Sequence, residues 1–395
     1  MRAVSTWYEG TLDDVDLNDF AGGDGYLFVR DGVGFAGRGV AARVDADEAV
    51  TTLAAIQCED HVGIPGSGPI AIGVLPFKPG ATAKLIIPAV TIGKTADGRV
   101  WITIIDDAPV PASTPEPLAS AAEFTVRPGV SVDVYLAAVT AARDAVKSGS
   151  IEKAVIARDL VVTSDRPIDV HAVMRRLRAS FGSSYRYAVD GFVGASPELL
   201  VQLDGSTVSS HPLAGTTPRT GDPATDARLA SELLASAKNQ IEHRVVVNVV
   251  HDTLLPWASY LDWEPEPSIV AVANVQHLGT RMQGQLSQPS PDVLTLARAL
   301  SPTPALGGHP QAAAIALIER VEGFRRGHYG GTVGWVDANG NGTWAVAIRC
   351  AEFSPDRRSA RLFAGGGIVA DSDPHHELAE TQAKFQAMLS AIIRP

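Results

Sequence analysis

The feature of this sequence that most constrains its fold is a succession of short strand-like segments with no helix between them. Residues 332–336, 344–350 and 361–364 are largely apolar and are separated by turn sequences such as DANGNG. Strands joined by tight turns pair antiparallel, because parallel strands need a long crossover connection. Helical patterns fall between groups of strands and not after each strand. We therefore exclude a doubly wound parallel sheet and predict large antiparallel sheets.

The first 120 residues are predicted to be rich in strands and to carry no chemistry. Their strand-like segments lie at residues 26–30, 70–77, 84–88 and 100–105. A helix is predicted at 50–58, and a segment rich in Pro, Ser and Ala, 108–122, is predicted to be a surface connection. We therefore divide the chain into a β-rich part, residues 1–120, and a second domain, residues 121–395. The sequence leaves open whether the two pack as one domain.

The middle of the chain combines helical and strand-like patterns. Residues 131–148 carry apolar side chains along one stripe, which predicts an amphipathic helix. A strand is predicted at 153–163. Two further strands, 186–193 and 199–203, are predicted to form a hairpin through the sequence GASPE. One long helix is predicted over 226–255.

Charge and composition exclude several classes of function. The 395 residues include 44 acidic and 33 basic ones, for a net charge of −11, and no run of Lys and Arg stands out. Nucleic acid and anionic membranes are therefore poor partners. No run of about 18 apolar residues is present for a membrane span. The two cysteines form no CxxC pair, and the N-terminal segment lacks an apolar signal core, so we expect a soluble cytoplasmic protein.

Residues 361–384, near the end of the chain, contain a candidate binding segment. After a short strand come Gly365, Gly366 and Gly367, which are predicted to form a loop that brings bare backbone against a ligand. The spacing is not that of a dinucleotide-binding GxGxxG, so the glycines alone identify no ligand.

The helix predicted after these glycines places charged side chains together. Pro374 suits its first turn and Asp373 suits its N-cap. Glu377, Glu380 and Lys384 follow at helical spacing on one face. A helix N-terminus with two carboxylates within one turn suits an anion bound through a hard cation. Taken alone, Glu380 and Lys384 also fit an ordinary surface ion pair, which is the commoner case.

Three charged residues in apolar surroundings are candidates for proton transfer or metal binding. Lys153 lies within an apolar strand, where desolvation favours the neutral amine that can act as a base. Glu198 lies between two apolar segments, where a carboxyl group can stay protonated and act as an acid. Glu242 precedes a run of valines and suits a metal carboxylate. Each also fits a side chain that reaches water from a strand edge, a turn or a helix face.

Arg349 is a candidate for binding a carboxylate of the ligand. In the predicted strand 344–350 it shares a face with Ala345 and Ala347, which leave room for a carboxylate that Arg holds in bidentate fashion. A solvent-facing Arg fits the same pattern. Tyr329 and His277 are considered with it, although residues of these types more often pack in the core.

Taken together and in this order, these segments resemble the chorismate-utilising enzymes, a family that includes the isochorismate, salicylate, anthranilate (component I) and aminodeoxychorismate synthases. The resemblance covers about residues 125–395. It rests on the stretches EKAVIAR, GASPELL, HPLAGT, KNQIEH, VQHLGT, GHYGGTVGW, WAVAIR, AGGGIV and ELAETQAK. It implies an α+β fold of the anthranilate-synthase type, with two large, mainly antiparallel sheets enclosing a core and helices outside. It also implies that residues 121–395 are the chorismate-binding catalytic domain of a monomer.

The resemblance further implies roles for individual residues. Lys153 matches the general base that activates water, and Glu198 matches the acid that protonates the departing C4 hydroxyl. Glu242 and Glu380, with Glu377 close by, match the carboxylates that hold a catalytic Mg²⁺. The substrate contacts that it implies are Thr216, His277, Tyr329, Arg349, Gly365, Gly366, Gly367 and Lys384.

The branch of the family is predicted from three positions. Lys153 argues for water as nucleophile and against an anthranilate synthase. The loop that begins at Ser301, SPTPALGGHPQ, is close to the HPTPAVGG pattern of isochorismate synthases, and Asn239 stands where salicylate synthases carry Glu. We therefore predict a Mg²⁺-dependent isochorismate synthase that acts on chorismate. Salicylate synthase is the main alternative, and aminodeoxychorismate synthase and an inactive chorismate-binding protein remain open. The sequence also leaves open whether the product enters a menaquinone or a siderophore pathway.

Overall fold

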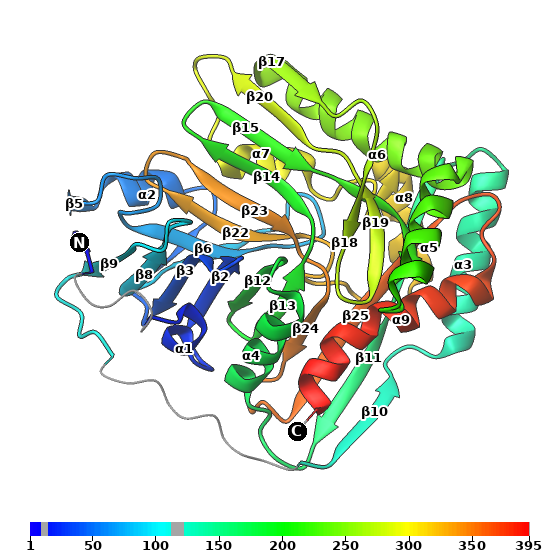
Figure 1. Cartoon of the computed structure of the whole chain (residues 1–395), viewed down its shortest axis with the longest axis horizontal. Helices are drawn as coiled ribbons and strands as arrows, with labels where there is room; N and C mark the ends of the chain where they lie inside the picture. Colours follow the sequence, from blue (N-terminus) through cyan, green and yellow to red (C-terminus); the bar gives the residue numbers. More distant parts are fainter. Residues whose placement is uncertain (9–14, 112–121, 395) are drawn as a thin grey trace.

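The computed structural model describes residues 1–8, 15–111 and 122–394, and two large β-sheets that face each other form the body of this part (Figure 1). All strand pairs in the described residues are antiparallel except β1 with β5. Helices lie outside the sheets (Figure 1). The predicted fold class, α+β with two large, mainly antiparallel sheets, is confirmed. A small third sheet was not predicted.

The first sheet, as described, has 13 strands, 12 of which follow one another by hydrogen bonding. In spatial order these are β10 (Phe124–Pro128), β11 (Lys153–Ser164), β25 (Ser359–Ile368), β24 (Cys350–Phe353), β13 (Phe192–Ser196), β12 (Tyr185–Val189), β2 (Tyr26–Arg30), β3 (Val33–Arg38), β8 (Val90–Lys94), β9 (Val100–Ile105), β1 (Arg2–Trp7) and β5 (Gln57–Asp60). The short strand β21 (Gly308–His309) pairs with the start of β11.

The second sheet has nine strands in the described residues and the small sheet has three. The second sheet runs β17 (Ala258–Trp263), β20 (Met282–Leu286), β15 (Thr207–His211), β14 (Leu199–Asp204), β23 (Gly342–Val346), β22 (Thr332–Asp337), β6 (Ile70–Leu75), β7 (Lys84–Ile87) and β4 (Ala42–Asp45). The small sheet runs β16 (Leu213–Pro218), β19 (Val275–Gly279) and β18 (Ser268–Ala271). Strands from residues 1–120 and from residues 121–395 lie side by side in both large sheets, through the pairs β12–β2 and β22–β6.

The helices cover the outer faces of the sheets. The first sheet is covered by α1 (Leu17–Ala21), α4 (Val170–Phe181) and α9 (Pro374–Ile393), and its β11 side by α3 (Val132–Lys147) and α8 (Gln311–Val321). The second sheet contacts α2 (Ala49–Ala54) and α7 (Val293–Leu300), and the small sheet contacts α5 (Pro223–Ala235) and α6 (Ala237–Leu254), which the 3-10 turn Leu255–Trp257 follows. Among the helices of residues 1–8, 15–111 and 122–394, none combines the length and apolar character needed to cross a membrane.

The largest core fills the space between the two large sheets. Apolar and aromatic side chains from both sheets, including Phe28, Tyr187, Ile72 and Trp344, are almost completely buried there. Alternate residues of the same strands face the helices and form a second core, so the strands of the first sheet are apolar on both faces. This explains why β2 and β11 read as nearly continuous apolar segments in the sequence.

The predicted hairpin through GASPE is wrong. The turn of the hairpin lies earlier, between β12 and β13, which pair with each other. The chain then leaves the first sheet at Pro197 and enters the second sheet with β14. Proline has no N–H group to continue a strand ladder, so the pairing ends there and Glu198 lies at a crossing between the sheets.

The predicted strand 344–350 is also wrong in its second half. β23 ends at Val346 in the second sheet, and the chain enters the first sheet as β24 at Cys350. Between them Arg349 adopts φ 53°, in the left-handed region that non-glycine residues rarely occupy. The amide of Val346 donates to the Glu198 carbonyl, 3.1 Å, and this bond joins the two crossings.

The glycines Gly365–Gly367 form no loop. They continue β25 and pair with Ala157, Ile156 and Val155 of β11. Glycine lowers strand propensity, so the local pattern predicted a break, but pairing on a central strand overrides it.

Two helix predictions need correction. The helix predicted at 226–255 is two helices, because Ser236 is extended and its side chain caps α6 by accepting from the Asn239 amide. The helix predicted at 50–58 ends at Ala54, and β5 follows. Of the predicted connection at 108–122, residues 112–121 lie outside the described residues.

Candidate active site

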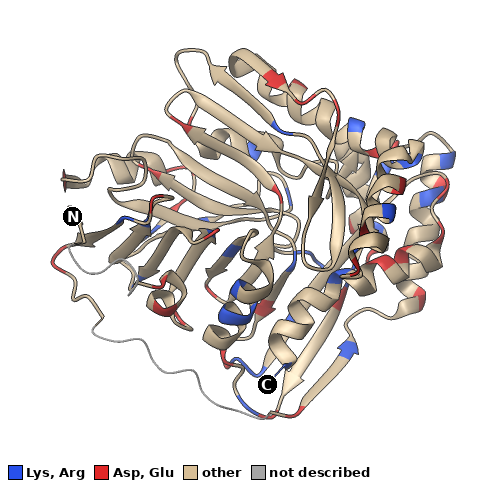
Figure 2. Ribbon diagram, in the orientation of Figure 1, with Lys and Arg blue, Asp and Glu red and all other residues tan. Residues whose placement is uncertain are grey.

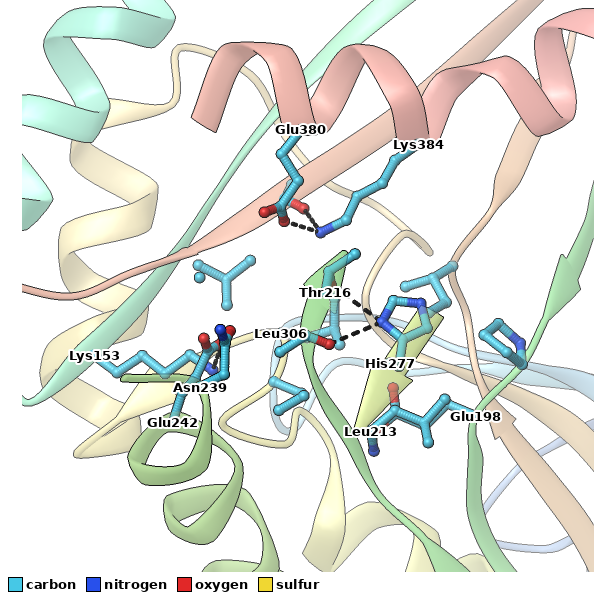
Figure 3. Close-up of a pocket in the computed structure, with 18 of the residues that line it drawn as sticks. Lys153, Glu198, Leu213, Thr216, Asn239, Glu242, His277, Leu306, Glu380 and Lys384 are labelled. Atoms are coloured by element: carbon cyan, nitrogen blue, oxygen red, sulfur yellow. Dashed lines mark hydrogen bonds and ion pairs between the residues drawn. The ribbon is translucent and has the colours of Figure 1, made fainter. Parts of the chain in front are cut away.

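A cavity of about 760 Å³ lies where the large sheets, the small sheet and helices α6 and α9 meet. It is lined by all of the predicted site residues except Gly366 (Figure 3). They come from both sheet crossings, one end of the β11–β25 ladder, the small sheet and the two helices, which lie far apart in the sequence. The set is Lys153, Glu198, Thr216, Glu242, His277, Tyr329, Arg349, Gly365, Gly367, Glu377, Glu380 and Lys384.

The glycines of β25 let carboxylates approach the backbone. A Cβ atom on Gly367 would lie 2.5 Å from Glu242 Oε1, and one on Gly366 would lie 2.6 Å from Glu377 Oε2. Both distances are shorter than van der Waals contact allows. Gly366 therefore makes room for a cavity carboxylate although it does not line the cavity itself.

Lys153 and Glu242 form a buried ion pair at one side of the cavity. Lys153 Nζ lies 2.7 Å from Glu242 Oε1, and the two side chains are 3% and 12% exposed (Figure 3). Lys153 is the first residue of β11, and Glu242 comes from α6. A buried charge needs such a partner, because desolvation otherwise opposes it.

Glu198 is almost completely buried at the crossing between the sheets. Burial raises the pKa of its carboxyl group to about 8, although the Leu213 amide and the charges of Lys153 and Arg349 act in the opposite direction. The Leu213 amide donates to its Oε1 at 3.4 Å. At neutral pH this carboxyl group is protonated, as a general acid requires.

Arg349 and His277 form a polar chain at the back of the cavity. Arg349 Nη2 lies 3.1 Å from His277 Nε2. A guanidinium only donates, so Nε2 accepts and Nδ1 carries the proton, which it shares with the Gly215 carbonyl and the Thr216 hydroxyl. Burial, with the charges of Arg349 and Lys384, lowers the pKa of His277 well below its ordinary value. The imidazole is therefore neutral and leaves the Arg349 charge available to an anion.

Tyr329 completes this wall. Its ring stacks on Phe363, with centroids 5.3 Å apart and planes 13° apart, and burial raises the pKa of its phenol. The hydroxyl therefore stays protonated and can donate. A Cβ atom on Gly365 would lie 3.0 Å from it, so the glycine gives the hydroxyl its place.

Helix α9 supplies the opposite side of the cavity, and its N-cap was predicted correctly: Asp373 accepts from the His375 and His376 amides. Lys384 Nζ bonds to Glu380 Oε1 at 2.5 Å and to the Gly365 carbonyl at 2.8 Å (Figure 3). Burial, and then the charge of Glu380, raises the pKa of Glu377 to about 7. A buried carboxyl group, Glu377, thus lies beside the partly exposed carboxylate of Glu380.

No group of three or more His, Cys, Asp and Glu side chains in the part of the chain that the structure describes is arranged to hold a metal ion. Two of the three predicted metal carboxylates are turned toward lysines, Glu242 toward Lys153 and Glu380 toward Lys384. The donor set is nevertheless suited to a hard cation, because three carboxylates from two helices line one cavity and hard cations prefer oxygen ligands.

Sequence reasoning missed several cavity residues. Asn239 was used only to predict the branch, yet it lines the cavity beside Lys238. Lys238 precedes Glu242 by one helical turn, and this i,i+4 spacing was a signal that could have identified it. The loop that begins at Ser301 contributes Ala305 and Leu306.

Comparisons with known proteins identify relatives of this chain. Residues 100–393 match the protein family described as chorismate binding enzyme. A Mycobacterium tuberculosis protein, provisionally named as the isochorismate synthase MenF, is 41% identical over 340 residues, which cover 83% of this chain and 87% of that protein. Isochorismate synthase DhbC of Bacillus subtilis is 37% identical over 338 residues, 82% of this chain and 81% of that protein.

A solved structure shows the same fold. The structure of MenF, the menaquinone-specific isochorismate synthase from Escherichia coli, superimposes with a TM-score of 0.86. The match covers 99% of this chain and 94% of that chain at 23% sequence identity.

Proposed function

Because this chain belongs to the family of chorismate-binding enzymes, we propose that it is an isochorismate synthase, an isomerase that moves the hydroxyl group of chorismate from C4 to C2. The observation that carries the proposal is the presence of Lys153 and Glu198 in one cavity, with the Glu198 pKa raised to about 8. A base and a protonated acid are the two groups that this reaction requires.

The reaction exchanges one water molecule for another. Water attacks C2 and gives a proton to Lys153, while Glu198 protonates the C4 hydroxyl, which leaves as water. The acid is needed because hydroxide is a poor leaving group. After the reaction Lys153 carries one extra proton and Glu198 has lost one. Transfer of a proton from Lys153 to Glu198, through solvent, restores both groups with no net change in protons.

Lys153 acts as a base only in its neutral form. In this structure its ammonium group is paired with Glu242. A cation held by Glu242 would take this counter-ion from Lys153. Lys153 would then be free to accept the proton of the attacking water.

We propose Mg²⁺ as that cation, held by Glu242 and Glu380 with Glu377 close by. When bound, Mg²⁺ draws electron density from the ring carboxylate of the substrate and orients it. Before binding, the lysines neutralise Glu242 and Glu380, and Glu377 is partly protonated because its pKa is raised to about 7.

The proposed binding mode places the second carboxylate of chorismate at Arg349. The guanidinium is buried, and within the described residues it is hydrogen-bonded to the neutral His277 and forms no ion pair, so a ligand carboxylate meets an unpaired cation there. The Tyr329 hydroxyl is a second donor on the same wall. Thr216, Lys384 and Gly365–Gly367 are proposed to shape the rest of the site.

The experiment that tests the function is incubation of the full-length protein with chorismate and Mg²⁺, followed by chromatography of the products at neutral pH. We expect isochorismate as the main product. Salicylate and pyruvate as main products would identify a salicylate synthase instead, and unchanged chorismate would contradict enzymatic activity.

The proposed metal is tested by removing it. We expect EDTA to abolish turnover and excess Mg²⁺ to restore it, because Glu242, Glu377 and Glu380 have no other divalent partner in the mechanism. Turnover that resists EDTA after dialysis would contradict the assignment of these carboxylates.

A further inference from the structure

A second cavity lies on the helix side of the first sheet and shares no lining residue with the candidate active site. It lies among β2, β12, α1 and α4, elements that contact one another, and Figure 1 shows them together. Its empty volume is about 790 Å³. Its charged and amide lining residues are Asp16, Asn18, Asp31, Lys94, Arg178 and Arg186.

Arg186 reaches this cavity because of strand alternation. Its neighbours in β12, Tyr185 and Tyr187, face the core between the large sheets, so Arg186 faces the helices. Only 1% of its surface is exposed, which makes it one of the largest fully buried side chains of the described residues. A guanidinium at this depth is costly unless an anion neutralises it.

The protein satisfies Arg186 only in part. Nη1 donates to Asn18 Oδ1 at 2.5 Å, but Nε has no hydrogen-bond partner. No carboxylate in the described ranges forms an ion pair with Arg186. Burial, and then the charge of Arg178, lowers the pKa of Arg186 to about 10, so the group remains charged at neutral pH.

The two carboxylates of the cavity are committed elsewhere. Asp16 caps α1, accepts from the Asn18 amide and side chain at 2.8 and 2.7 Å, and forms an ion pair with Arg178. Asp31 is 62% exposed and lies 3.6 Å from Arg30. Neither forms an ion pair with Arg186, although the charge of Asp31 acts on it from a distance and partly opposes the lowering of its pKa.

Lys94 adds a second uncompensated charge at the cavity. No ion pair joins it to an acidic residue in the part of the chain that the structure describes. Helix α4 contributes basic residues on the same side of the sheet, as Figure 2 shows. A local excess of positive charge is unexpected in a chain with a net charge of −11. It matches what an anion-binding cavity requires.

We propose that this cavity is a second binding site of the protein, which takes a small oxyanion with Arg186 as its central ligand and Lys94 at its rim. The planar guanidinium offers Nε–H and a terminal N–H side by side, the geometry that phosphate, sulfate and carboxylate oxygens accept. The site is independent of the proposed reaction, because it shares no residue with the catalytic cavity.

The test is thermal unfolding of the full-length protein in Tris-chloride buffer with added inorganic phosphate, sulfate or acetate. Sodium chloride at equal ionic strength is the control. We expect a saturable rise in Tm of about 3 °C at an oxyanion concentration about 100 times Kd, and none with chloride. A response to phosphate and sulfate alone would identify a tetrahedral oxyanion, and a response to acetate would identify a carboxylate.

Variants connect the response to Arg186. We expect Arg186→Met to lose the oxyanion-dependent rise. Arg175→Met is the matched control, since Arg175 lies on α4 outside the cavity and should keep the full rise. Lys94→Met, at the rim, should shift the response to several-fold higher concentration, and it serves as the test if Arg186→Met does not fold. Equal Tm in oxyanion and chloride, or a wild-type response in both cavity variants, would overturn the proposal.

Discussion

Each of the two cavities has a buried arginine beside it, and the two arginines differ in how many of their guanidinium nitrogens have hydrogen-bond partners. Behind the catalytic cavity, Arg326 is 4% exposed and every nitrogen of its guanidinium has a partner. On the helix side of the first sheet, Arg186 is 1% exposed, and among the described residues its guanidinium bonds to Asn18 alone. The comparison teaches that burial alone does not reveal whether a charged side chain has a structural or a ligand-binding role. A donor without a hydrogen-bond partner is more informative, because it indicates a place where a ligand could supply the missing acceptor.

Arg326 connects strand β11 with the loop that begins at Ser301, and both segments contribute to the wall of the candidate active site. It forms a buried ion pair with Glu322 and donates to the carbonyls of Val155, 2.6 Å, and Leu306, 2.8 Å. Glu322 in turn accepts from the Ala157 amide at 2.7 Å. Strand β11 and the loop that begins at Ser301 are thereby fixed to each other, and nothing remains for a ligand to bind.

The substitution Lys153→Ala removes one partner of the buried Lys153–Glu242 ion pair in the candidate active site. Loss of a general base typically lowers turnover by about 10²–10⁴-fold, and we expect a loss in this range with fold and chorismate binding retained. Steady-state kinetics and calorimetric chorismate titration measure the two effects. Lys147→Ala, at the exposed end of α3, is the control. Turnover like that of the wild type would remove Lys153 from the mechanism.

The two arginines are compared directly by the same substitution. Arg326→Met leaves Glu322 buried without its partner, so we expect unfolding free energy to fall by about 3–5 kcal/mol. Arg186→Met removes a buried charge that has no ion pair and costs one hydrogen bond to Asn18, so we expect a much smaller loss of stability in oxyanion-free buffer. Urea unfolding measures both.

A double variant shows whether the Glu322–Arg326 ion pair itself stabilises the protein, or whether the loss in the single variant comes from leaving one buried charge unpaired. Glu322→Leu with Arg326→Met replaces the ion pair by apolar groups, which is often neutral for stability. We expect it to recover most of the stability lost in Arg326→Met. If Arg186→Met and Arg326→Met destabilise the protein equally, the contrast between the two regions is wrong.

The smallest expected effect is the pH dependence of kcat/KM that follows from Glu198. The pKa of Glu198 is raised to about 8, so its acid form is present below that pH and is lost as pH rises through it. We expect kcat/KM for chorismate to fall about tenfold per pH unit above pH 8. Glu198→Gln should remove this limb along with most of the activity. A profile that stays flat to pH 10 would exclude Glu198 as the acid.

Part of the candidate site could be predicted because its signals are local. The N-cap Asp373, the shared face of Glu377, Glu380 and Lys384, and the strand that begins at Lys153 each depend on residues within a few positions. Capping and periodicity act over that distance. The resemblance to a known family supplied the remaining site positions.

Other features could not be predicted because they depend on distant partners. The glycines of β25 are a strand only because β11, about 200 positions earlier, provides the ladder. The position of Arg349 depends on β23 and β24 lying in different sheets. No local pattern records which sheet a strand joins, since many apolar segments are equally suited to each place.

The sequence by itself determined the antiparallel class, the N-cap of the last helix and the residue types of the candidate active site, because turns, capping and charge depend on neighbouring residues. The tertiary structure alone decided where the chain crosses between sheets, how Lys153 meets Glu242, and that Arg186 lies buried and unpaired. These outcomes follow from packing between segments far apart in the chain, where burial and desolvation are set by the whole fold and not by local sequence.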